Sequence, residues 1–145
     1  MRFRIPGTDL TFDIPDDCWS FAEMQDFHPE HSRSYCLPIE ASSGRVDIEI
    51  VQISDIAPPR ERLATAPVLT KTRIAPILLA LRANRELRPV QIERTPQDGY
   101  KFRLAHGFHR YCASIAAGFT AIPGVFHEIS WCRLRSVIMR SRSLF

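Results

Sequence analysis

The chain has 145 residues, of which 45% are hydrophobic and 24% are charged, and its formal net charge is +3. This length fits one domain with a substantial core, and this composition excludes a disordered chain. No apolar run approaches the roughly 20 residues of a spanning helix, and the first residues lack the apolar stretch of a secretion signal. The four cysteines show no metal-binding spacing. We therefore expect a cytoplasmic protein with reduced thiols, no metal site of its own and no membrane contact.

Residues 1–45 predict an N-terminal extension that is rich in β-structure. Apolar residues at 3–5 and 10–14 alternate with polar neighbours, which is typical of two short strands. The acidic start of 15–22 favours a short helix, because carboxylates are stabilised at a helix N-terminus. Residues 35–39 predict an edge strand, since the proline within them excludes a central one.

The predicted core covers residues 46–127. It begins with a strand at 46–50, where apolar and acidic residues alternate. A helix over 72–84 follows from apolar residues at helical spacing. Strands at 89–93 and 100–104, separated by a Pro-Gln-Asp-Gly turn, predict a hairpin.

The segment around Gly107 predicts a strand that runs through a glycine into a helix over 109–118. Apolar residues recur there at the spacing of one helix face, namely Phe108, Cys112, Ile115 and Phe119. The first turn carries His109 and Arg110. Unpaired N–H groups and the positive end of the helix dipole favour an anion at such a place, and Gly107 allows close approach to the backbone. The pattern therefore predicts a phosphate-binding helix start.

The order of Gly107, His109 and Arg110, followed by a helix of small residues and then Ile122-Pro123, resembles the ParB and sulfiredoxin superfamily. The resemblance covers well over half of the chain. It implies an α+β fold in which a small mixed sheet carries two main helices. The whole chain is then a single domain, 1–145, with an extension (1–45), a core (46–127) and a basic C-terminal segment (128–145).

The same resemblance implies a set of phosphate ligands. Gly107, His109 and Arg110 match the phosphate segment of the family, and His106 is a further donor beside it. Arg73 stands where the nucleotide-binding helix of sulfiredoxin has a lysine. Arg60 and Arg62 follow two prolines, like the arginine of the family's proline-arginine loop.

Phe108 is the main departure from the family. Sulfiredoxin has its cysteine nucleophile at this position, and ParB proteins have a glutamate associated with the metal-bound triphosphate. A phenyl ring supplies neither a nucleophile nor a carboxylate. We therefore expect no sulfinic-acid reductase activity. The chain also ends about twenty residues after Pro123, too short for the helix-turn-helix pair of partition ParB proteins, so we expect no sequence-specific DNA recognition.

Three functions remain open from the sequence. The first is a binding module for a nucleotide or another phosphate ligand at Gly107–Arg110. The second is a nucleotide hydrolase, phosphotransferase or nuclease, with Mg²⁺ as a possible cofactor and no catalytic residue assigned. The third is weak, sequence-independent nucleic-acid binding through the arginines of the C-terminal segment, Arg133, Arg135, Arg140 and Arg142.

Overall fold

A computed structural model describes residues 1–29, 33–38, 47–65 and 68–126. Its centre is a five-stranded sheet in the order β3-β7-β5-β6-β4. The strands are β3 (Ile48–Gln52), β4 (Ile56–Ala57), β5 (Val90–Glu93), β6 (Phe102–His106) and β7 (Ala121–Phe126).

The sheet is mixed, as predicted. β7 is antiparallel to β3 and parallel to β5, and the short β4 runs parallel to β6. β5 and β6 form the predicted antiparallel hairpin. Asp98 and Gly99 turn it with φ angles of 51° and 84°, the left-handed values that an Asp-Gly turn adopts. The predicted small mixed sheet is therefore confirmed.

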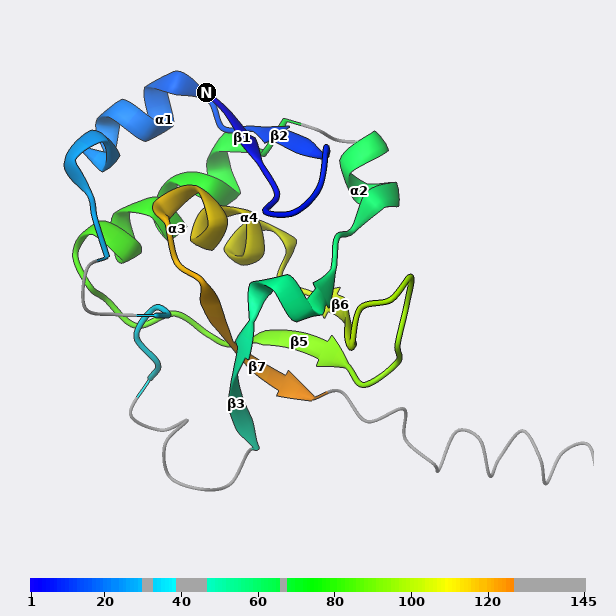
Figure 1. Cartoon of the computed structure of the whole chain (residues 1–145). Coiled ribbons are helices and arrows are strands. Elements are labelled where there is room, and N and C mark those ends of the chain that lie inside the picture. The colour runs from blue at the N-terminus through cyan, green and yellow to red at the C-terminus, as the bar shows by residue number, and fades with distance from the viewer. Residues whose placement is uncertain (30–32, 39–46, 66–67, 127–145) are drawn as a thin grey trace, which may run out of the picture.

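Two main helices, α3 (Lys71–Arg82) and α4 (Phe108–Ala117), pack on one side of this sheet (Figure 1). The bounds of α4 lie within one residue of the prediction, and the helix is capped by Gly107 and Gly118, both of which have positive φ. α3 ends before Asn84, whose φ is 53°. Two shorter helices are α1 (Asp16–Phe21) and α2 (Arg60–Thr65), and two single 3₁₀ turns are η1 (Met24–Asp26) and η3 (Ile53–Asp55).

The predicted N-terminal strand pair is present as β1 (Arg2–Arg4) and β2 (Thr11–Asp13), which form an antiparallel sheet of their own. Side chains from this part enter the same buried cluster as those of α3, α4 and the main sheet. A bridge between Asp13 and Val68 also joins β2 to the segment before α3. The N-terminal part therefore packs directly on the predicted core.

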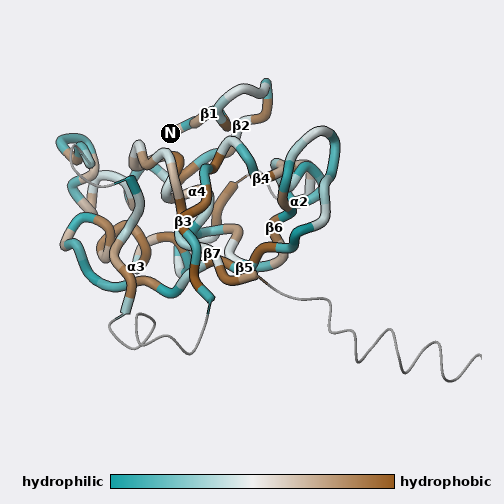
Figure 2. The backbone as a smooth tube through the Cα atoms, turned by 60° about the horizontal axis from the view of Figure 1, so that its bottom comes forward, coloured by the Kyte–Doolittle hydropathy of each residue, from teal (hydrophilic) through white to brown (hydrophobic). Residues whose placement is uncertain are grey.

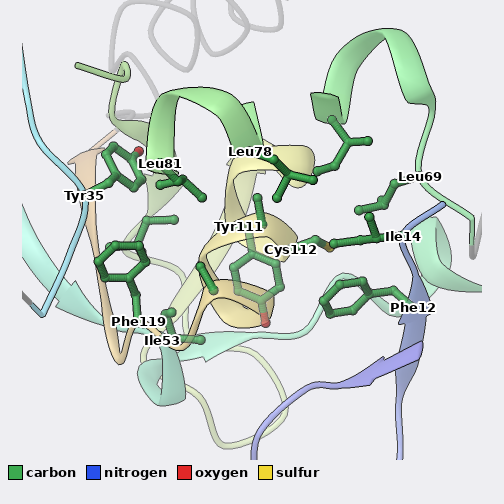
Figure 3. Close-up of a cluster of buried hydrophobic side chains, with 14 of the residues drawn as sticks. Phe12, Ile14, Tyr35, Ile53, Leu69, Leu78, Leu81, Tyr111, Cys112 and Phe119 are labelled. Atoms are coloured by element: carbon green, nitrogen blue, oxygen red, sulfur yellow. The ribbon is translucent and has the colours of Figure 1, made fainter. Parts of the chain in front are cut away.

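Tyr111 lies at the centre of the hydrophobic cluster, with Phe12 on one side of its ring and Ile53 on the other in the view of Figure 3. Its side chain is fully buried, and its hydroxyl has no hydrogen-bond partner among the described residues. Burial raises the pKa of this phenol far above its usual range, so it stays neutral. A buried hydroxyl without a partner costs stability, because its bonds to water are lost and not replaced.

We therefore expect Tyr111→Phe to stabilise the protein by about 1 kcal/mol, since the substitution removes the unpaired hydroxyl and keeps the ring. Urea unfolding of the two proteins measures this difference. A loss of stability on substitution would mean that the hydroxyl does have a partner.

The edge strand predicted at 35–39 is wrong for its described residues. Residues 35–38 have no regular secondary structure, and residue 39 lies outside the described part. The Tyr35 hydroxyl donates to the Arg88 carbonyl at 2.7 Å, and the Leu87 N–H donates to the Cys36 carbonyl at 3.0 Å. These bonds to the loop before β5 take the place of the strand pairing that was predicted.

The proline-arginine loop of the prediction is also wrong in form, because α2 begins at Arg60. Leu63 is its single buried residue, so six residues offer too little periodicity to reveal a helix.

Figure 2 shows the segments around α2 as largely hydrophilic and β7 as largely hydrophobic. None of the helices in the described ranges combines the length and the apolar character that crossing a membrane requires.

Candidate functional site

The strand β6 passes through Gly107 directly into α4, as the sequence predicts. Gly107 has φ 105°, and the first bond of α4 runs from the Tyr111 N–H to the Gly107 carbonyl at 2.9 Å. Helix geometry leaves the earlier N–H groups without acceptors in the helix. They carry partial positive charge, which favours an anion.

Gly107 also brings this turn against β5. A Cβ added at this position would lie 2.7 Å from Cγ1 of Val90 and 3.3 Å from Nη2 of Arg110. Real Cβ atoms essentially never come within 3.0 Å of a neighbouring atom, so the contact with Val90 and the backbone angle together require glycine here.

A hollow of about 610 Å³ opens at this helix start, and we name it the α4 hollow. Its volume lies within the usual range of small-molecule sites. Segments from α2, α3, β6 and α4 contribute to it, and its lining residues are Pro59, Arg62, Arg73, Ile77, Leu104, Ala105, His106, Gly107, Phe108, His109 and Arg110.

Five of the six predicted ligand residues line this one hollow. They are Arg73, His106, Gly107, His109 and Arg110. Arg60 does not, and lines a neighbouring hollow instead. Arg62, which the sequence named beside Arg60, faces the α4 hollow. Both arginines line that neighbouring hollow, and of the two only Arg62 also lines the α4 hollow.

Arg110 is not a free charge in this hollow. Its Nη1 donates to the carbonyls of Arg88, at 2.8 Å, and Pro89, at 2.6 Å. Tyr35 donates to the same Arg88 carbonyl. The side chain therefore ties the first turn of α4 to the loop before β5, and only its remaining N–H groups can reach a ligand.

His109 is buried, with 9% of its surface exposed, and its Nε2 has no hydrogen-bond partner among the described residues. Of the predicted apolar stripe, Cys112 and Phe119 are buried, whereas Phe108 and Ile115 are only partly buried and His109 takes a buried position that the stripe did not include. Burial, and then the charges of Arg73 and Arg62, lower the pKa of His109 below its usual 6.5. Neutral His109 therefore stabilises the fold above about pH 6.5, and that contribution is lost as the pH falls toward the lowered pKa.

Phe108 forms a wall of the hollow rather than a reactive group. The Arg62 guanidinium lies over its ring, with 5.3 Å between the guanidinium carbon and the ring centroid. This cation–π contact holds a long side chain in place without using up its N–H donors. Arg62 is therefore directed at the hollow while its charge stays available.

Comparisons with known proteins find similarity among solved structures only. No family model matches the sequence, and no curated protein matches it. Among solved structures, the chain is similar to sulfiredoxin from Arabidopsis thaliana, with 19% identity and a TM-score of 0.45 over 62% of this chain and 94% of that chain. The predicted α+β class is confirmed by the strands and helices described above. Membership of the ParB and sulfiredoxin superfamily stays a prediction.

No residue that lines the α4 hollow is an aspartate or glutamate within the described ranges. Metal-assisted hydrolysis would need a carboxylate near Gly107, and the described lining residues do not supply one. Cys112 is fully buried, and burial raises its pKa far above the usual range, so it is a packing residue and not a nucleophile. The four arginines of the C-terminal segment lie outside the described residues.

Proposed function

We propose that the α4 hollow binds a phosphate-bearing ligand of the nucleotide class, with a phosphate at the N-terminus of α4. The observation that carries this proposal is the charge of the lining. Three arginines line the hollow, two histidines add ring nitrogens, and no carboxylate among the lining residues of the described ranges offsets the arginine charges. Like charges held together in this way are unfavourable unless an anion joins them.

His109 supports the same proposal. Its imidazole is buried without a partner for Nε2, next to two arginines that oppose its protonation. A phosphate oxygen would give Nε2 a partner and would offset both arginines. Ile77, Leu104 and the Phe108 ring add apolar surface on which the base of a nucleotide can pack.

The test is an NMR titration of the His109 imidazole with inorganic phosphate and with a panel of nucleotides, each with and without Mg²⁺. A bound anion favours the imidazolium, so the pKa of His109 is expected to rise when the ligand binds. By linkage, affinity should then increase as the pH falls from neutral toward that pKa.

His28 is the internal control, because it lies in the described part but outside the α4 hollow. Its imidazole signals should not respond to the ligand. If none of the phosphate compounds changes the signals of His109 at millimolar concentration, the proposed function is wrong.

A further inference from the structure

A second hollow adjoins the α4 hollow. It measures about 220 Å³, and we name it the α2 hollow. The two share Pro59, Arg62 and Leu104, so Arg62 stands between them. α2 lies beside β6 in the fold (Figures 1 and 2), and the α2 hollow is formed where these two elements meet.

The α2 hollow is also basic. Arg60 and Arg103 line it together with the shared Arg62, against one carboxylate, that of Glu61. Arg60 and Arg103 are exposed. Arg103 forms an ion pair with Glu93, but its Nη1 lies 3.9 Å from the carboxylate oxygen, which is too far for a hydrogen bond. The N–H donors of Arg103 are therefore available to a ligand.

We infer that the two hollows form one groove that binds short single-stranded nucleic acid. One phosphate lies at the α4 N-terminus, and the next lies between Arg60 and Arg103. This inference rests on the proposed function and extends it, because a mononucleotide would occupy the α4 hollow alone. Arg62, shared by both hollows, contacts the strand as it passes from one to the other.

Two features favour a single strand as the occupant. Proteins that bind single strands combine a basic groove along the backbone with an aromatic ring on which a base can stack. Here Phe108, with Arg62 over its ring, stands in the α4 hollow next to the row of arginines. Both hollows are concave, whereas duplex recognition uses an element that projects into a DNA groove.

The experiment compares a 5′-phosphorylated hexanucleotide with the mononucleotide of the same base, using wild type and Arg103→Gln. The variant should bind the hexanucleotide about tenfold more weakly and the mononucleotide unchanged. Each phosphate contact with a single strand contributes roughly 0.7 to the slope of log K against log salt, so the hexanucleotide slope should fall by about that amount. Fluorescence anisotropy gives the hexanucleotide affinities, and calorimetry gives those of the mononucleotide.

Arg82→Gln is the matched control, because Arg82 is exposed at the end of α3 and lines neither hollow. It should leave both affinities unchanged. Arg60→Gln should behave like Arg103→Gln. Melting temperatures equal to that of the wild type confirm that all variants are folded.

Several results would overturn the inference. They are a hexanucleotide that binds no tighter than the mononucleotide, an unchanged hexanucleotide affinity in Arg103→Gln, and tighter binding of the corresponding duplex. If the mononucleotide still binds in these cases, the proposed function stands and the groove is wrong. If neither ligand binds, both are wrong.

Discussion

Replacing Arg62 and Arg73 together by glutamine is expected to lower the affinity for a phosphate ligand by about a hundredfold or more. Both guanidinium groups line the α4 hollow, and both act electrostatically on His109. A hydrogen bond to a charged group contributes about 1.5–3 kcal/mol, and each 1.4 kcal/mol changes affinity about tenfold. Calorimetric titration with the tightest-binding nucleotide of the panel measures the loss.

The double variant should keep its fold, because both arginines are exposed and form none of the ion pairs found among the described residues. It also has a readout that needs no ligand. Without the two charges, the pKa of His109 should rise toward its usual value, although burial still lowers it. An unchanged affinity in the folded variant, with the expected rise in the pKa of His109, would place the ligand elsewhere.

Arg110 is a poorer probe of the site, although it belongs to the predicted phosphate segment. Its Nη1 holds two backbone carbonyls, so Arg110→Ala would also release the loop before β5. Those carbonyls would lose charged donors, which costs stability as well as any ligand contact. Substitutions of Arg73 and Arg62 are expected to change ligand affinity with less effect on the stability of the fold.

The sequence predicted those parts of the fold that local chemistry determines. Gly107 and Gly118 mark the ends of α4, and Asp98-Gly99 marks the hairpin, because each needs a left-handed backbone angle. The path of residues 35–38 could not be predicted in this way. It depends on hydrogen bonds to Leu87 and Arg88, some fifty residues along the chain.

The same distinction applies to the residues of the candidate site. Gly107 and His109 could be predicted, because one stretch of sequence shows a strand, a glycine and a helix in order. The family resemblance, and not periodicity, singled out Arg73. Nothing in the sequence marks Arg103, which has the pattern of an ordinary outward residue in a strand. It becomes a candidate only because β6 lies beside α2.

Gly107→Ala is expected to cause the largest loss of stability among single changes at the site. The new Cβ would lie 2.7 Å from Cγ1 and 3.0 Å from Cβ of Val90, a fully buried residue of β5. Overpacking of this kind costs about 1–3 kcal/mol, and the left-handed backbone adds about 1–2 kcal/mol for a residue with a Cβ. Urea unfolding should therefore show a loss of about 2–5 kcal/mol.

Gly99→Ala is the matched control for the backbone term. Gly99 has φ 84°, close to that of Gly107, but a Cβ there would meet no atom within 4 Å. It should lose only the backbone part, about 1–2 kcal/mol. The difference between the two variants then measures the contact with Val90. Equal losses of stability in the two variants would show that β5 shifts to accommodate the added methyl group. The close approach of the α4 N-terminus to the sheet would then not be what fixes the shape of the hollow.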